Sequence, residues 1–181
     1  MKKLEQFLIR NNACSDGLKF AKNLTLEEFW TTCHRGDWIL WLFAKMNPNN
    51  FRELTLAKGH CANTARHLME DERSTKAVDV AIAFGEGKAT RGELDAAADA
   101  ARVARVARAA YAAYAAYAAS DAADAAYAAY AAAADADAAY AAYAAYAASD
   151  AAASAKKQNQ KLTADICRKY LPLELWDLSK I

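Results

Sequence analysis

The feature that most constrains this chain is a long segment, residues 93–171, that contains neither glycine nor proline. Thirty-eight of the 63 residues at 93–155 are alanine, and eight of the nine tyrosines lie there too. Alanine is the best helix former, and a segment this long easily overcomes the cost of helix nucleation. The segment therefore predicts helix. Because alanine buries little area, it also predicts that any thick core lies elsewhere in the chain.

A single helix over residues 90–155 would be about 100 Å long at 1.5 Å per residue. Such a rod would expose a large apolar surface with eight tyrosines on it. Residues that favour helix caps occur at Ser120-Asp121, at Asp135 and Asp137, and at Ser149-Asp150. We therefore expect the tract to fold back near one of these places, as an antiparallel hairpin or bundle of long helices.

The tract contains an exact repeat, because the sequence YAAYAAYAASDAA at residues 111–123 recurs at 140–152. An offset of 29 residues corresponds to eight helical turns plus about 20°, so both copies would face the same side of a continuous helix. Two interpretations stay open: a packed Ala/Tyr bundle without a ligand, or a partner-binding surface of tyrosines. The tyrosines concerned are Tyr111, Tyr114, Tyr117, Tyr127, Tyr130, Tyr140, Tyr143 and Tyr146.

The larger apolar residues lie mainly in residues 1–84 and 162–181. Six glycines and two prolines in 181 residues are few, and no alternating β-branched pattern predicts a strand. The sequence therefore predicts an all-α fold in three parts. These are a compact N-terminal helical bundle (1–90), the long Ala/Tyr/Asp-repeat helices (91–155), and a C-terminal helix and tail (156–181) that packs back on the bundle.

Two capping boxes mark helix starts. In each, a threonine lies three residues before a glutamate: Thr25 before Glu28, and Thr90 before Glu93. At this spacing the threonine hydroxyl can accept from the glutamate N–H while the glutamate side chain accepts from the threonine N–H. Asn50 has the same spacing to Glu53, which predicts a capped helix over residues 51–69.

A further helix start is predicted at Asp37, which follows Arg35-Gly36 and can cap the helix that comes next. That helix is apolar nearly all round, as a buried core helix is. Its apolar residues are Trp38, Leu40, Trp41, Leu42 and Phe43. Ser15 to Gly17 is interpreted as a turn or cap.

The four cysteines are widely spaced, with no CxxC motif: Cys14, Cys33, Cys61 and Cys167. Pairing Cys33-His34 with His60-Cys61 would supply four zinc-type ligands. Adjacent helical residues point about 100° apart, however, and the spacing matches no known zinc finger or ribbon. We expect reduced, mostly buried thiols and no metal site.

Charge and motifs limit the function classes. Lysine and arginine number 23 and aspartate and glutamate 22, for a net charge of +1, which argues against a general polyanion binder. The sequence contains no P-loop, HExxH or Gly-x-Ser-x-Gly motif, so we expect neither catalysis nor a cofactor. A charged start and the lack of a long non-alanine apolar run favour a cytoplasmic protein without a membrane span.

Local basic groups flank the repeat and could form one patch for an acidic partner or phosphates, or a solvated face. They are Arg102, Arg105 and Arg108, at i, i+3 spacing, and Lys156, Lys157 and Lys161.

Two blocks resemble a known family. The sequence CHRGDWILWL at residues 33–42, preceded by EFW at 28–30, resembles the W..C.RGDW.LWL signature of alanine-rich immunity proteins of bacteria and phages. The sequence ADICRKYLP at 164–172 is similar to that family as well. The resemblance implies an all-α intracellular protein that neutralises a toxin or antagonises another protein. It implies no particular catalytic or binding residue.

Within the first block, three tryptophans lie close in sequence to Arg35 and Asp37: Trp30, Trp38 and Trp41. We interpret them as a structural core cluster with a charged rim, and the alternative is a recognition site. Our functional hypothesis is a non-enzymatic, protein-binding inhibitor, either immunity-type or phage-encoded, directed at a toxin, nuclease or defence protein. The alternatives are a self-associating structural protein and a nucleic-acid binder that uses the basic patch.

Overall fold

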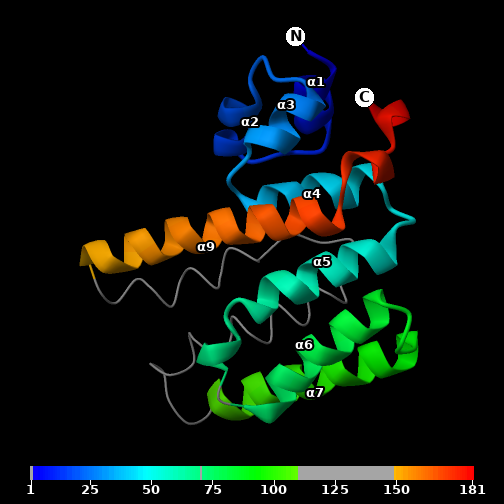
Figure 1. The fold of residues 1–181 in the computed structure, drawn as a ribbon, viewed down its shortest axis with the longest axis vertical. Coiled ribbons are helices and arrows are strands. Elements are labelled where there is room, and N and C mark those ends of the chain that lie inside the picture. Colours follow the sequence, from blue (N-terminus) through cyan, green and yellow to red (C-terminus); the bar gives the residue numbers. More distant parts are fainter. Residues whose placement is uncertain (1, 70, 110–148) are drawn as a thin grey trace.

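The computed structural model describes residues 2–69, 71–109 and 149–181, and these residues form helices and turns with no strand among them (Figure 1). The fold of the described chain is all-α. Its α-helices are α1 (Lys3–Arg10), α2 (Ser15–Ala21), α3 (Leu26–Thr32), α4 (Gly36–Met46), α5 (Phe51–Asn63), α6 (Glu72–Gly85), α7 (Arg91–Ala109) and α9 (Ser149–Tyr170). Short 3-10 helices lie at Arg66–Leu68, Leu173–Leu175 and Leu178–Lys180.

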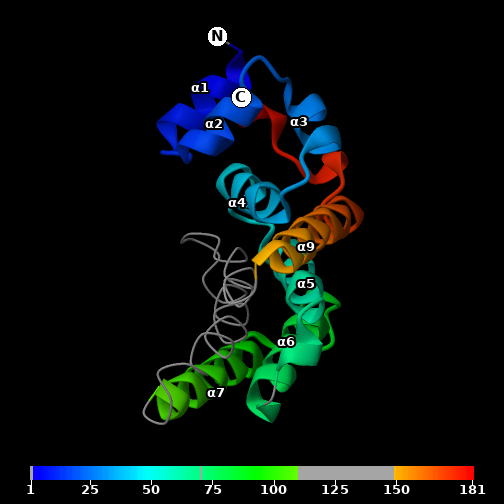
Figure 2. The ribbon, with the colours of Figure 1, turned by 90° about the vertical axis from the view of Figure 1, so that its left-hand side faces the viewer.

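The helices are stacked along the long axis of the molecule. Helices α1, α2 and α3 lie at one end, α4 and α9 pack together next to them, and α5, α6 and α7 follow toward the other end (Figures 1 and 2). Both termini lie at the α1–α3 end (Figure 1). None of the described helices has the length and apolarity needed to cross a membrane.

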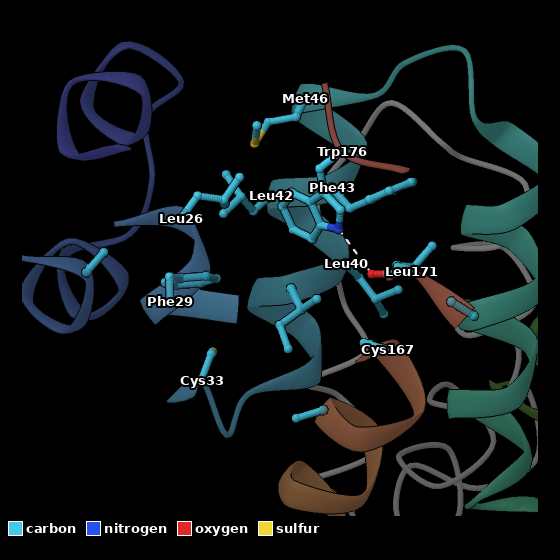
Figure 3. Close-up of a cluster of buried hydrophobic side chains, with 14 of the residues drawn as sticks. Leu26, Phe29, Cys33, Leu40, Leu42, Phe43, Met46, Cys167, Leu171 and Trp176 are labelled. Carbon is cyan, nitrogen blue, oxygen red and sulfur yellow. Dashed lines mark hydrogen bonds between the residues drawn. The ribbon is translucent and has the colours of Figure 1, made fainter. Parts of the chain in front are cut away.

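The main core joins both ends of the chain. Side chains of α1, α3, α4 and α5 pack against the end of α9 and the C-terminal tail (Figure 3), where Leu171 and Trp176 are buried. The ring of Trp176 meets Phe43 edge-on, with 5.3 Å between ring centroids. Trp30, Trp38 and Trp41 are only partly buried and pack against this core from its margin.

The start of α4 lies very close to α9. A Cβ atom at Gly36 would sit 2.6 Å from Thr163 Oγ1 and 2.7 Å from the Thr163 carbonyl carbon. Since real Cβ atoms do not approach backbone so closely, only glycine permits this packing of α4 on α9. Cys167, one turn further along α9, donates from Sγ to the Gly36 carbonyl at 3.5 Å.

Arg168 of α9 clamps the end of α3. Its Nε donates to the Trp30 carbonyl at 2.8 Å, and its Nη2 donates to the Cys33 carbonyl. The last carbonyls of a helix have no partner inside the helix, so the guanidinium satisfies groups that would otherwise need water. Its Nη1 also donates to Asp165, at 2.8 Å.

The carbonyl of Leu171 completes this junction by accepting from two indole groups. Trp30 Nε1 donates to it at 3.1 Å and Trp176 Nε1 at 3.0 Å. Two tryptophans that lie far apart in the sequence are therefore held by one backbone oxygen.

Both predicted capping boxes are confirmed. Glu28 accepts from the Thr25 backbone N–H at 2.6 Å while Thr25 Oγ1 accepts from the Glu28 N–H at 3.1 Å. The second box has the same pattern, since the Thr90 N–H donates to Glu93 at 2.7 Å and the Glu93 N–H donates to Thr90 Oγ1 at 3.2 Å.

Helix α5 begins at Phe51 as predicted, but its predicted cap and its predicted end are wrong. Asn50 has φ −88° and ψ 49°, not the extended backbone of a capping residue, and its side chain makes no capping bond. The helix that follows ends at Asn63 instead of residue 69, where Thr64 Oγ1 donates back to the Cys61 carbonyl at 2.7 Å. Ser15, interpreted as part of a turn or cap, begins helix α2.

The prediction that Asp37 caps α4 is also wrong. The helix begins at Gly36 with Arg35 in the capping position, two residues earlier than a cap at Asp37 implies. Asp37 therefore lies in the first turn, and its carboxylate binds Arg35. A carboxylate in the first turn still complements the positive end of the helix dipole.

Part of the long tract lies within the described chain. Helices α7 and α9 confirm the helix prediction at residues 91–109 and 149–170, and α7 packs on α6 through alanines such as Ala97 and Ala101. The predicted fold-back and the eight repeat tyrosines, Tyr111 to Tyr146, lie outside the described residues. The side chains of the predicted basic patch that lie outside the described residues are those of Arg102, Arg105, Arg108 and Lys156. The other two, Lys157 and Lys161, are exposed on α9.

Gly36→Ala should lower the free energy of unfolding by about 1–3 kcal/mol, because the new methyl group overpacks the contact with Thr163. Gly92→Ala is the matched control, since nothing lies within 4 Å of a Cβ at that helical position. This control should raise stability by about 0.5 kcal/mol. Urea unfolding checks both, and equal effects of the two substitutions would contradict the close packing of α4 on α9.

Arg168→Met should lower the free energy of unfolding by roughly 2–4 kcal/mol, because two backbone acceptors lose a charged donor. The methionine keeps the apolar stem, so packing changes little. Lys169→Met, at the neighbouring exposed position, should change stability by less than about 0.5 kcal/mol. Thermal unfolding of both variants tests this role of Arg168. An Arg168→Met protein as stable as the unmodified chain would show that its hydrogen bonds to α3 contribute little.

Candidate binding pocket beside Trp38 and Trp41

A pocket of about 280 Å³ lies between the α1–α2 region and α4. Its lining is mostly apolar, with Leu8 from α1, Phe29 from α3 and Leu42 from α4. Trp38 and Trp41 line it as well. For comparison, an apolar cavity of about 150 Å³ holds a benzene molecule, so this space suffices for a large apolar side chain or a small aromatic ligand.

The polar part of the lining is dominated by an ion pair between Arg35 and Asp37. Arg35 Nε lies 2.8 Å from Asp37 Oδ1, and Nη2 lies 2.5 Å from Oδ2, which makes the pair bidentate. The hydrogen bond to Asp37 raises the pKa of Arg35 above its usual value, although partial burial opposes this. Asp37 is only 9% exposed, so the pair is a fixed element of the wall and not a loose surface contact.

Aromatic and cationic neighbours fix the position of Trp38. The Arg35 guanidinium carbon lies 4.6 Å from the centroid of the Trp38 ring. Phe20 of α2 lies 5.7 Å from Trp38 and also 5.7 Å from Phe29. Because Phe20 of α2 and the guanidinium of Arg35 both contact this ring, its orientation is set before any ligand arrives.

Trp41 has a cation on its outer side. Lys45, one helical turn further on, places Nζ 5.9 Å from the centroid of the Trp41 ring. Lys45 is exposed and forms no ion pair with an acidic side chain in the described part of the chain. Within the described part of the chain, the positive charge at the rim near Trp41 is therefore not paired with a carboxylate.

Cys14 brings a thiol to the pocket. It is the exposed one of the four cysteines, and its Sγ accepts from the Gly17 N–H at 3.4 Å. Cys33, Cys61 and Cys167 are buried. Burial raises the pKa of Cys33 to about 11 and raises that of Cys167 well above its usual value.

The residues weighed as zinc ligands point to different neighbours. The His34 ring lies against Phe20, with centroids 5.9 Å apart, and the His60 ring stacks on Tyr170 at 4.2 Å. Over the residues that the structure describes, no three histidine, cysteine or acidic side chains are grouped to hold a metal ion.

The structure thus separates the predicted site residues. Trp38, Trp41 and Asp37 meet at the pocket, whereas Trp30 binds the Leu171 carbonyl. Sequence reasoning missed Leu8 and Cys14, because their role depends on how α1 and α2 pack against α4. No local motif signals that packing.

Native alkylation at pH 8 should modify Cys14 fastest, since the other thiols are buried and Cys33 has a pKa of about 11. All four cysteines should react in denaturing urea. Peptide mapping after iodoacetamide treatment checks both results. Native modification of Cys33 or Cys167 as fast as Cys14 would contradict the packing described here.

The two sequence blocks that resemble alanine-rich immunity proteins contact each other directly. The block at 33–42 meets the block at 164–172 through Arg168 and through Cys167, which bind the carbonyls of Cys33 and Gly36. The family resemblance itself stays an expectation. Comparison with known proteins finds no match to a family model, a curated protein or a solved structure.

Proposed function

We propose that the chain binds another protein and inhibits it, in the manner of an immunity protein, and that the pocket beside Trp38 and Trp41 holds an anchor side chain of the partner. The observation that carries this proposal is the pocket itself, an apolar space of about 280 Å³ lined by two half-buried tryptophans and an arginine. Tryptophan and arginine are the residue types most enriched at the energetic centres of protein interfaces.

The fixed walls support binding. Trp38 is held by Arg35 and Phe20, and Arg35 is held by Asp37. A partner side chain that enters the pocket therefore orders few groups of this chain, so little conformational entropy opposes binding.

Charge indicates the chemistry of the partner. Lys45 is exposed beside Trp41 and has no acidic partner among the described side chains. A partner surface that presents a large apolar side chain with acidic residues around it would complement this rim. The proposal therefore commits to a protein with an acidic, apolar-tipped loop or helix.

The resemblance to immunity proteins and the tyrosine repeat agree with this function. Tyrosine is enriched at protein interfaces and loses little rotamer entropy there. The proposal assigns the eight repeat tyrosines to the same partner, as a second contact surface.

The partner can be captured through Cys14. A benzophenone attached to this exposed pocket thiol should crosslink the partner in a lysate, and the crosslinked protein is then purified for calorimetry. Trp41→Ala should weaken its binding at least about 30-fold, the loss expected of a central anchor contact. Lys45→Glu should weaken binding about threefold to tenfold and reduce its dependence on salt.

Two control variants separate binding from folding. Ile9→Ala removes an apolar side chain that is 48% exposed and lies outside the pocket lining, and Lys161→Glu reverses an exposed charge on α9. Both should bind like the unmodified chain. A purified partner that binds Trp41→Ala and Lys45→Glu at full strength would refute the pocket, and capture of only this chain would favour self-association.

A further inference from the structure

Two buried thiols from different helices lie next to each other. Cys61 Sγ on α5 and Cys167 Sγ on α9 are 3.8 Å apart, although the residues are separated by 106 positions in sequence. Cys61 is 6% exposed and Cys167 is fully buried. Neither of these two cysteines lines the pocket, and the proposed partner binding makes no use of them.

The contacts of the two sulfur atoms leave them facing each other. Cys61 Sγ also donates to the Thr163 carbonyl at 3.7 Å, and Cys167 Sγ donates to the Gly36 carbonyl at 3.5 Å. These are weak sulfur hydrogen bonds, so little is lost when either side chain turns. A disulfide requires the sulfur atoms to close to about 2.05 Å, a movement that side-chain rotation and small helix shifts can supply.

We propose that Cys61 and Cys167 form a redox-reactive dithiol, which a small peroxide oxidises to a disulfide that joins α5 to α9. The inference does not depend on the proposed partner binding.

The accessibility of the two thiols sets the order of the reaction. The sulfur of Cys61, the less buried of the two, attacks the peroxide first: an S–O bond forms, the O–O bond breaks, and one water leaves with the proton of the Cys61 thiol. The Cys167 sulfur then attacks the Cys61 sulfenic acid, the S–O bond breaks, and a second water leaves with the Cys167 proton. In sum, two thiols and one hydrogen peroxide give one disulfide and two waters, with two electrons passing from sulfur to peroxide.

Because Cys167 is the more deeply buried thiol, we expect it to attack the sulfenic acid and not the peroxide. Desolvation raises the pKa of this thiol well above its usual value, so it stays protonated and reacts poorly with peroxide directly. Once Cys61 carries the sulfenic acid, the neighbouring sulfur needs only to attack an atom already beside it.

Such a disulfide would hold α9 on α5 and would close a loop that contains α6, α7 and residues 110–148. Cross-linking residues so far apart in sequence restricts the unfolded chain strongly. The oxidised protein should therefore be more stable than the reduced one, with α9 unable to leave the core.

The test is peroxide titration of the reduced, full-length protein in its native state, followed by acid quenching, alkylation and peptide mapping without reductant. The expected product is a monomer that yields a Cys61–Cys167 disulfide peptide, whether or not the exposed Cys14 is also oxidised. The melting temperature should rise by about 5 °C or more. Dithiothreitol should reverse both changes.

Matched variants decide the assignment. Cys33→Ala and Cys14→Ala should still form the crosslink, whereas Cys61→Ala should abolish the crosslink and the rise in melting temperature. Oxidation confined to Cys14, a disulfide to Cys33, or equal yield of the Cys61–Cys167 peptide in denaturing urea would overturn the proposal. If a variant fails to fold, peptide mapping of the unmodified chain still shows whether peroxide joins Cys61 to Cys167.

Discussion

The close contact of α9 with the turn between α3 and α4 is the constraint on which the described structure depends. Gly36 allows the backbones to approach, and Arg168 satisfies the carbonyls at the end of α3. The contact brings the last residues of the chain into a core built largely from the first sixty, where Trp176 packs on Phe43. Without it, the N-terminal helices would lose one wall of their core.

Different residues of the block at 33–42 face two different parts of the structure. Gly36 and the Cys33 carbonyl face α9, whereas Arg35, Asp37 and Trp38 line the pocket. The two interpretations of this block, core and recognition site, therefore apply to different residues within it. Each residue of the segment Arg35-Gly36-Asp37 has a structural role, since the glycine fits against α9 and the two charged residues bind each other.

Local signals made the helices predictable, but tertiary contacts did not follow from them. The box at Thr25 and the alanine-rich stretch that became α7 depend on neighbours within a turn or two, which the sequence states directly. Asp37 looked like a cap because its spacing fits one, yet Arg35 offered its carboxylate a bidentate partner. The burial of Trp176 and the pocket position of Cys14 need the packing of distant segments, which no periodicity reveals.

The thiol pair and the pocket share one helix start. Cys167 Sγ donates to the Gly36 carbonyl, and the residues on either side of that glycine, Arg35 and Asp37, form the polar part of the pocket wall. Turning Cys167 toward Cys61 removes a hydrogen bond from this first turn of α4. That bond is weak, so the first turn of α4 is held against α9 mainly by the close fit of Gly36 against Thr163, on which the thiol pair and the pocket wall both depend.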